Sequence, residues 1–456
     1  MASTIKYALL AAAACLSVPA AAADAPAEAK EILKRSIAFK TVKGQGQVPA
    51  YAAYLASVLK DAGFAASDIE ITPVGETAIL TARYRGTSSA KPIVLLAHMD
   101  VVEANPADWE RDPFTAVEEN GYIYGRGSED NKFDLAMIVA TVAQLKREGY
   151  KPRRDIILGF SGAEETSWDS TRVLADKLKH AELVLNGDGG GGLRDQQGKP
   201  LFYGLQAGEK TYSDYQIEVT DAGGHSSAPT PGNAIHRLAK VLDRIAAHKF
   251  APMANELTSA SLRYTSKQVG GELGAAMARY AANPKDMAAA ELISAKPEFV
   301  GQIRTTCVAT MVNGGHAPNA LPQRATANVN CRIFPGVSIE TVRAELARVG
   351  GDPTAKVTVL DDPAFSDASP LRPDVVQAVT KAVQARYPGL EVTPSMSAGA
   401  TDGLIFRAAG VPAYGVSGLF QKSEDSFAHG LNERIPVAEI APALAHYRSI
   451  ITDLSK

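Results

Sequence analysis

The sequence predicts an α/β domain with a mostly parallel sheet, interrupted by an inserted α+β unit. Residues 93–97, 155–161 and 183–186 read as strands buried on both faces, and stretches of helical periodicity separate them. From about residue 211 the strands alternate apolar and polar positions, as half-buried strands of an antiparallel sheet do. The chain has 456 residues, more than one hydrophobic core usually serves, so we expect two domains.

The first part of the chain alternates helices and strands in the order typical of a parallel sheet. Helices are expected within 27–62, because apolar residues recur at helical spacing over 50–59. The other expected elements of this part are strands at 77–84, 93–97, 155–161 and 183–186, a helix at 135–148 and a helix near 170–179.

The next part indicates helices packed against an antiparallel sheet. Its expected elements are strands at 212–219, 305–312, 325–333 and 356–360, helices at 234–248 and 339–349, and a helical stretch at 253–290. After a linker at 363–373, a helix at 374–387, a strand at 414–416 and a helix at 437–454 complete the first domain. We therefore predict one domain at 24–210 and 364–456, with an inserted domain at 211–363.

The composition is that of an ordinary globular protein. Lys and Arg number 47 against 50 Asp and Glu, and this near balance argues against a dedicated nucleic-acid binder. Hydrophobic residues make up 46% of the chain, which excludes an intrinsically disordered protein. After the first two dozen residues no apolar run is long enough to cross a bilayer, so we expect a soluble mature protein.

Residues 1–23 are similar to a secretory signal peptide. Lys6 precedes a short apolar run, and Ala21 and Ala23 fit a small-residue cleavage site. A membrane anchor is disfavoured because the run is short, and lipidation of Cys15 is disfavoured because Ala stands three residues before it. The expected location is the periplasm or the extracellular medium.

Export would leave Cys307 and Cys331 as the only thiols, in an oxidising compartment. They lie in the strand-like runs 305–312 and 325–333, and antiparallel pairing of these runs would place them at a distance that a disulfide tolerates. Cysteines of this kind are more often small buried hydrophobic residues. We therefore favour two buried thiols and keep the disulfide as the alternative.

Residue types that ligate metals follow several of the expected strands, at the sheet edge where open α/β sheets place their ligand sites. They are His98 and Asp100, then Asp130 in the glycine-rich turn 125–132, then Glu164 and Glu165, then Asp188, and finally His429 in a loop. Any one of them alone is more often a solvated carboxylate or a hydrogen-bonded imidazole. Together they need a compensating charge, and imidazole and carboxylate without thiolate suit zinc or a similar divalent metal.

Two other chemistries fit the sequence poorly. Residues 187–192 formally satisfy the G-x-G-x-x-G pattern, but no helix is expected after them, which argues against a dinucleotide site. Residues 159–163 lack the final glycine of the nucleophile elbow found in many serine hydrolases.

A series of motifs runs along the chain: LLAHMDVV (95–102), 109–114, GYIYGRGSEDNK (121–132), SGAEE (161–165), GGHSS (223–227), NALP (319–322) and His429. In this order they resemble the cocatalytic dizinc exopeptidases, family 20 of metallopeptidase clan MH. This family includes aminoacylase, glutamate carboxypeptidase, succinyl-diaminopimelate desuccinylase, carnosinase-type dipeptidases and Gly-X carboxypeptidase. The resemblance covers nearly the whole mature chain, and 303–306 is most similar to the Gly-X carboxypeptidase and N-acyl-amino-acid hydrolase branch.

The resemblance implies a hydrolase-like α/β catalytic domain, a lid and dimerisation domain, and two divalent metal ions. Zinc is the expected metal, with cobalt or manganese as alternatives. By this resemblance His98 and Asp188 would bind one ion, Glu165 and His429 would bind the other, and Asp130 would bridge them.

The same resemblance implies a role for further residues. Asp100 would hydrogen-bond the far nitrogen of His98, and Glu164 would be the general base that takes a proton from a metal-bridging water. His225 would reach the site of the other subunit of a homodimer and stabilise the oxyanion. The implied substrate contacts are Arg332 with a carboxylate, Asn319 nearby, and Gly399 and Thr401 in a glycine-rich loop.

The expected function is hydrolysis of an amide bond in small peptides or N-acyl amino acids, in the manner of a carboxypeptidase. Asp188 stands where the family's carboxypeptidases and deacylases often have Glu, so dipeptidase or aminopeptidase specificity is an alternative. A catalytically inactive peptide-binding homologue is a further alternative, and the intact Glu164 argues against it.

Overall fold

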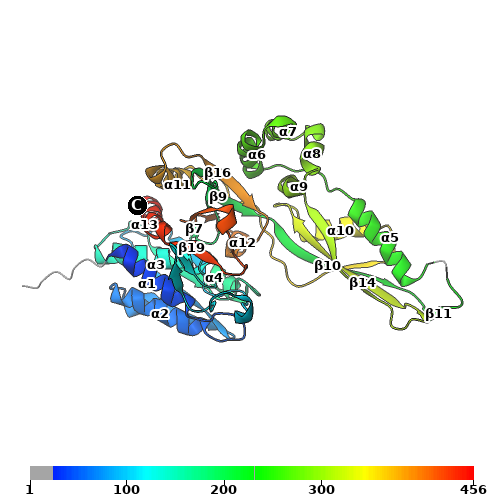
Figure 1. The fold of residues 1–456 in the computed structure, drawn as a ribbon, viewed down its shortest axis with the longest axis horizontal. Coiled ribbons are helices and arrows are strands. Elements are labelled where there is room, and N and C mark those ends of the chain that lie inside the picture. The colour runs from blue at the N-terminus through cyan, green and yellow to red at the C-terminus, as the bar shows by residue number, and fades with distance from the viewer. Residues whose placement is uncertain (1–23, 231) are drawn as a thin grey trace, which may run out of the picture.

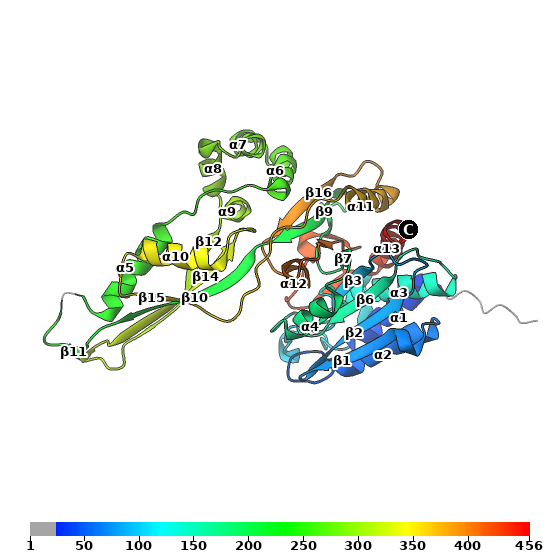
Figure 2. The same cartoon turned by 180° about the vertical axis from the view of Figure 1, so that it is seen from behind.

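The computed structural model describes residues 24–230 and 232–456. It contains a large sheet with helices on both faces and, beside it, an elongated unit built on a smaller sheet (Figures 1 and 2). The predicted signal peptide at 1–23 lies outside the described residues. In the described part of the chain, no helix combines the length and the apolar character needed to cross a bilayer.

The large sheet has ten strands in the order β1-β2-β6-β3-β7-β17-β9-β8-β18, with β16 also paired to β9. Strands β6, β3, β7 and β17 run parallel, as do the pairs β8 with β18 and β9 with β16. The expected mostly parallel sheet is thereby confirmed. Its strands are β1 (Ile69–Val74), β2 (Thr77–Tyr84), β3 (Ile93–His98), β6 (Ile156–Ser161), β7 (Leu183–Asn186), β8 (Gly191–Arg194), β9 (Pro200–Glu209), β16 (Val392–Ser397), β17 (Ala413–Gly415) and β18 (Phe420–Lys422).

Helices cover both faces of this sheet because its central strands are apolar on both sides. Leu95 packs in the cluster on one face and its neighbour Leu96 in the cluster on the other. The first face is covered by α1 (Ala25–Ile37), α2 (Val48–Asp61), α3 (Lys132–Arg147), α11 (Pro373–Arg386) and α13 (Ile440–Leu454). The second is covered by α4 (Asp169–Leu178) and α12 (Asp402–Ala408).

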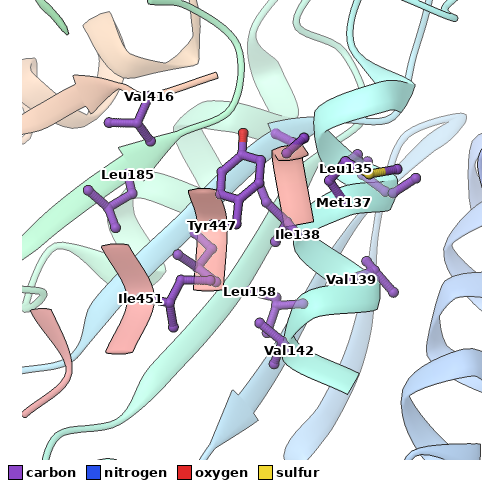
Figure 3. Packing of buried hydrophobic residues seen from close by; sticks show 14 of the residues in the cluster. Leu135, Met137, Ile138, Val139, Val142, Leu158, Leu185, Val416, Tyr447 and Ile451 are labelled. Carbon is purple, nitrogen blue, oxygen red and sulfur yellow. The ribbon is translucent and has the colours of Figure 1, made fainter. Parts of the chain in front are cut away.

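Helix α3 is apolar nearly all round because it lies between the sheet and two other helices, α1 and α13. Figure 3 shows Ile138 of α3 and Tyr447 and Ile451 of α13 meeting over Leu158 and Leu185 of the sheet. This packing holds the beginning of α3, and with it the preceding turn, against the carboxyl ends of the central strands.

The smaller sheet has the order β12-β14-β10-β15, and all its neighbouring strands are antiparallel. Its elements are β10 (Thr211–Thr220), β12 (Thr306–Gly314), β14 (Arg324–Ile333) and β15 (Lys356–Val359), with α5 (Ala234–Ala247) and α10 (Ile339–Gly350) on one face. Only Lys210 separates β10 from β9 of the large sheet, so one extended segment connects the two units. The two-stranded pair β11 (Gly224–His225) and β13 (Ala320–Leu321) lies at the far tip of the elongated unit (Figure 1).

Residues 256–303 form a third cluster of helices. They are α6 (Glu256–Val269), α7 (Gly271–Ala282), α8 (Met287–Ser294) and α9 (Pro297–Ile303). This segment falls within the predicted inserted domain, but α6 packs on the large sheet. Tyr264 donates a hydrogen bond to the Leu201 carbonyl at 3.3 Å, and Leu257 belongs to the hydrophobic cluster on the first face of that sheet. The division at residues 210 and 364 stays a prediction.

Cys307 and Cys331 form a disulfide. The expectation of two unpaired buried thiols is therefore wrong. Antiparallel pairing of β12 and β14 makes these two residues direct cross-strand partners, which brings their side chains together on one face of the sheet.

The remaining elements are short. A three-stranded sheet has the order β19-β5-β4, with β4 (Val117–Glu119), β5 (Tyr122–Tyr124) and β19 (Arg434–Pro436). The 3-10 helices are η1 (Ala66–Asp68), η2 (Pro106–Asp108), η3 (Ser423–Asp425) and η4 (Val437–Glu439). Strands β1, β8, β9, β16 and β18 of the large sheet were not predicted. The sequences of β8, β16 and β18 show neither a continuous apolar run nor clear alternation.

Candidate metal centre

The candidate ligands lie at the carboxyl ends of the parallel strands, as the sequence predicts. His98 is the last residue of β3, Glu165 follows β6, and Asp188 follows β7. Asp130 stands in the turn before α3, and His429 lies in the loop before β19. Parallel strands end at one edge of a sheet, and this arrangement brings residues from five segments to one place.

Asp130 faces both imidazole rings. Its Oδ1 lies 2.9 Å from Nε2 of His98, and its Oδ2 lies 3.2 Å from Nε2 of His429. On the first side Asp188 Oδ2 lies 3.9 Å from His98 Nε2, and on the second Glu165 Oε2 lies 3.0 Å from His429 Nε2. Two three-residue groups, each with ligand atoms within 4.8 Å of one another, therefore share Asp130.

The carboxylates and imidazoles of this cluster perturb each other. Burial lowers the pKa of His98, but the hydrogen bond and charge of Asp130 outweigh it and raise that pKa well above its usual range. Hydrogen bonds to Asp130 and Glu165 raise the pKa of His429 to about 10. Burial raises the pKa values of Glu164 and Asp188 well above those of free carboxyls. Several strongly perturbed pKa values in one cluster are typical of a functional site.

The backbone of Asp100 orients His98. Nδ1 of His98 lies 3.0 Å from the Asp100 carbonyl oxygen, which can only accept, so Nδ1 carries a proton. Nε2, which faces Asp130, is therefore the nitrogen that would bind a metal once it is deprotonated. The Asp100 side chain, expected to make this bond, lies 3.7 Å from Nδ1 and instead accepts from the backbone N–H groups of Glu164 and Glu165 at 3.1 and 3.0 Å.

These residues fit a pair of divalent cations. Two imidazoles and several carboxylates converge, and two of the carboxyls, Asp188 and Glu164, sit where burial disfavours their charged form. Bound cations would compensate these charges, and a donor set of nitrogen and oxygen without thiolate suits zinc and similar metals.

A cleft of about 1020 Å³ opens beside Glu164, Glu165 and His429. Arg332, half-buried on β14 of the smaller sheet, lines its other side, stacks on the Tyr212 ring at 4.6 Å and donates to the Ala398 carbonyl at 3.1 Å. The structure therefore places the predicted carboxylate-binding arginine in the cleft that borders the candidate metal centre.

A second cavity of about 690 Å³ touches the other side of the centre. Asp130 and Asp188 line it, together with the glycine run 189–192 and the side chains of Phe202 and Met396. Since the two cavities include different ligands of one cluster, the centre lies between them.

The structure does not bring His225 and Asn319 to this centre. Both are exposed at the β11 and β13 tip, where the Ser226 N–H donates to the Asn319 carbonyl at 3.0 Å. Neither lines the two cavities described above. The two residues lie beside each other, because β11 and β13 pair there.

Gly399 and Thr401 have different surroundings. Gly399 is exposed in the loop between β16 and α12. The Thr401 hydroxyl donates to Glu209 at 2.6 Å and accepts from Asn186. It also accepts from the Gly403 N–H and so caps the N-terminus of α12. This hydroxyl is fully used within the protein, which differs from the substrate contact that the resemblance implies.

Two buried polar residues around the ligands, Asn186 and Glu433, were not predicted from the sequence. Asn186 holds the Asp188 backbone from both sides, since its Oδ1 accepts from the Asp188 N–H at 3.0 Å and its Nδ2 donates to the Asp188 carbonyl at 2.9 Å. Glu433, four residues after His429, accepts hydrogen bonds from the loop that carries Asp130. No sequence pattern marks these residues, because Asn186 holds Asp188 through backbone groups only and the partners of Glu433 are distant in the sequence.

The profile of the family described as "Peptidase family M20/M25/M40" matches residues 94–453. The chain belongs to this family. The prediction of a family 20 hydrolase of peptide or amide bonds is thereby confirmed.

Relatives of known name support the same assignment. Human "N-fatty-acyl-amino acid synthase/hydrolase PM20D1" is 28% identical over 361 residues, which is 76% of this chain and 71% of the relative. "Probable carboxypeptidase S-like 2" of Dictyostelium discoideum is 26% identical over 401 residues, covering 81% and 72%. The M20 family metallo-carboxypeptidase Sso-CP2 from Sulfolobus solfataricus has a similar fold, with a TM-score of 0.69 and 20% identity over 94% of this chain and 99% of that one.

Proposed function

We propose that this M20 family protein is a dizinc metallohydrolase that cleaves amide bonds of small peptides or N-acyl amino acids. One observation carries the proposal: Asp130 faces His98 with one oxygen and His429 with the other, and Glu164 lies beside them in an open cleft. This is the arrangement that two divalent ions with a shared carboxylate ligand require. A relative of similar fold, from Bacillus subtilis, is described as a dinuclear metal binding peptidase of the M20 family.

The proposed mechanism divides the work among six residues. His98 and Asp188 would hold one ion, Glu165 and His429 the other, and Asp130 both. When bound, the ions supply Lewis acidity, which polarises the scissile carbonyl and lowers the pKa of water. Glu164 is then the general base that accepts the proton of the attacking water and donates it to the leaving nitrogen. Burial raises the pKa of the Glu164 carboxyl above its usual range, which makes it a stronger proton acceptor than an exposed carboxylate.

We infer that the substrate presents a carboxylate to Arg332. The guanidinium group lines the same cleft as Glu164, and it is held there by Tyr212 and the Ala398 carbonyl. A planar guanidinium suits two-point recognition of a carboxylate. On the far side of the centre, the cavity lined by residues 189–192 has room for an acyl group, because glycines contribute no side chains. This favours carboxypeptidase-like specificity over a dipeptidase or aminopeptidase.

We further propose a homodimer in which His225 and Asn319 complete the site of the partner subunit. The tip that carries them lies away from its own centre, and β12 presents a row of exposed apolar side chains at the sheet edge. Val308, Met311 and Val312 are 61%, 71% and 72% exposed. Such an edge is normally covered, and an edge strand pairs readily with a second copy of itself. In the partner's site His225 would donate to the developing oxyanion.

Export to the periplasm or the extracellular medium is proposed from the sequence of residues 1–23. The Cys307–Cys331 disulfide supports it, because such bonds persist in oxidising compartments.

The test is a substrate panel assayed with the mature chain, residues 24–456, loaded with zinc, cobalt or manganese. N-acyl amino acids, free dipeptides and C-terminal Gly-X peptides would each be offered with a free or an amidated carboxyl terminus. We expect hydrolysis of acylated substrates that keep the free carboxylate. Cleavage that depends on a free amine instead would support the aminopeptidase or dipeptidase alternative. No turnover with any metal would favour the inactive homologue.

A further inference from the structure

Two loops that carry candidate metal ligands start from the ends of paired strands. The Asp130 loop (residues 125–131) follows β5, and the His429 loop (residues 426–433) precedes β19. The two strands pair antiparallel, with Tyr124 opposite Arg434. Because this pairing places the end of β5 beside the start of β19, the loops leave the small sheet side by side.

Glu433, at the end of the His429 loop, holds the Asp130 loop. Its carboxylate is 0% exposed and accepts four hydrogen bonds from that loop. The donors are Arg126 Nη1 at 2.7 Å and the backbone N–H groups of Gly127 at 2.9 Å, Glu129 at 2.7 Å and Asp130 at 3.0 Å. The backbone of Asp130 is thus fixed by a residue of the opposite loop.

Glu129, beside Asp130, holds the His429 loop in return. Its Oε2 accepts from the Phe427 N–H at 2.7 Å, and its Oε1 accepts from the Ser426 hydroxyl at 3.1 Å and from Gln421 Nε2 at 2.6 Å. Each loop therefore contributes one carboxylate that binds the backbone of the other, an arrangement we name the reciprocal clasp (Glu129 and Glu433).

The loop held by the clasp contains a residue in a costly backbone conformation. His429 has a φ of 63°, in the left-handed region that a residue with a Cβ adopts at a cost. It is anchored on both sides, at Phe427 by Glu129 and at Glu433 by the Asp130 loop. The imidazole itself is half-exposed, with 55% of its side chain accessible, so packing alone does not fix it.

We propose that Glu129 and Glu433 are positioning residues that hold Asp130 and His429 at metal-binding separation, and that they act unequally on the two ions. The inference rests on the ligand assignment of the proposed function. Glu433 fixes the backbone of Asp130, the ligand shared by both ions, so its loss weakens both. Glu129 fixes the His429 loop, so its loss weakens the ion held by His429 and Glu165.

The test compares Glu129→Gln and Glu433→Gln with a matched control, Glu424→Gln. Glu424 lies near the same loop, but its side chain is 52% exposed and its ion pair with Lys422 is long, at 3.9 Å. The two stepwise zinc affinities of the metal-free mature chain are measured by competition with a chromogenic chelator. We expect Glu129→Gln to weaken one zinc by roughly 10- to 100-fold, the range typical of residues that orient ligands, and Glu433→Gln to weaken both. Glu424→Gln should match the wild type, and Glu129→Asp should regain part of the lost affinity.

The melting temperature of each metal-free variant is measured in parallel. Variants that melt earlier but keep both wild-type zinc affinities would overturn the clasp, because they would show a structural role only. If Glu433→Gln does not fold, Glu129→Gln alone tests the proposal, because it should weaken the binding of one zinc ion and leave the other unchanged. A wild-type chain that binds fewer than two zinc ions would contradict the proposed function, whereas two ions with unchanged variants would contradict only the clasp.

Discussion

The Asp100 carboxylate accepts a hydrogen bond from the backbone N–H of Glu164 at 3.1 Å, and its second oxygen accepts from the next N–H at 3.0 Å. One buried side chain therefore fixes the peptide that carries both the candidate base and a candidate ligand. The carbonyl of the same residue orients His98. Asp100 thus connects the ends of β3 and β6, and a change at Glu164 leaves this support in place.

Replacing the candidate base should separate chemistry from metal binding. We expect Glu164→Gln to lower kcat by about 10²- to 10⁴-fold, because it removes the group that accepts the proton. Metal content, measured by mass spectrometry of the dialysed protein, should stay at the wild-type value, since no assigned ligand is lost. Glu298→Gln, at an exposed position, serves as the control. A metal-loaded Glu164→Gln enzyme that retains most of its activity would contradict the mechanism.

Activity should depend on two subunits. His225→Ala and Glu164→Gln chains are each expected to be inactive alone, but in a mixed dimer one site receives an intact His225 and keeps its own Glu164. Such dimers, isolated with two affinity tags, should recover about half of the wild-type activity because a two-fold dimer has two equivalent sites. Absence of recovery in verified mixed dimers would show that His225 does not act across the interface.

Arg332 should govern recognition of the substrate carboxylate. Loss of a hydrogen bond to a charged group costs about 1.5–3 kcal/mol, so Arg332→Ala should raise KM about 10- to 100-fold. kcat for the same substrate should change less. For a substrate with an amidated carboxyl terminus, KM should be the same for the wild type and Arg332→Ala. Arg332→Lys should restore only part of the affinity for the free carboxylate. An equal loss with both substrates would point to a structural role for Arg332.

The disulfide should stabilise the smaller sheet. Its cysteines are 24 residues apart, and a loop of that length corresponds to about 2–4 kcal/mol. Urea denaturation of Cys307→Ala/Cys331→Ala should show a loss of this size. Reductant should lower the stability of the wild type and leave the double variant unchanged. Insensitivity of the wild type to reductant would mean that the bond contributes nothing to stability.

Acidification should destabilise the protein through His446. Burial lowers the pKa of this histidine to about 4, whereas an exposed histidine titrates near 6.5. Between these two pH values the unfolded chain binds a proton at His446 and the folded chain does not. The free energy of unfolding is therefore at its full value above pH 6.5 and decreases as the pH falls to about 4. The loss should approach roughly 3 kcal/mol for one group with this shift. Urea denaturation of His446→Gln over the same pH range should show a decrease in the free energy of unfolding that is smaller by this amount. If the stabilities of wild type and variant change in parallel with pH, His446 is not the group responsible.

Residue order alone located the strands that carry ligands, because strands buried on both faces leave a continuous apolar signature. His98 ends one of those strands, and Glu164, Glu165 and Asp188 follow two others within a few residues. Their shared edge could be inferred from parallel topology. By contrast β9 and β16 pair with each other across nearly 200 residues, and their amphipathic signal is weak. Their pairing, and the packing of α6 against them, depend on contacts that no local pattern encodes.

What the sequence by itself determined is the alternation of elements, the family and the set of chemically competent side chains. Each of these follows from local periodicity or from residue types at fixed spacing. Only the tertiary structure decided that Cys307 forms a disulfide with Cys331 and that the Thr401 hydroxyl donates to Glu209. It also decided that Glu129 accepts hydrogen bonds from the His429 loop and Glu433 from the Asp130 loop. Hydrogen bonds to distant backbone groups require a carboxylate but no motif, and so the residues that orient the ligands become visible only when the chain is folded.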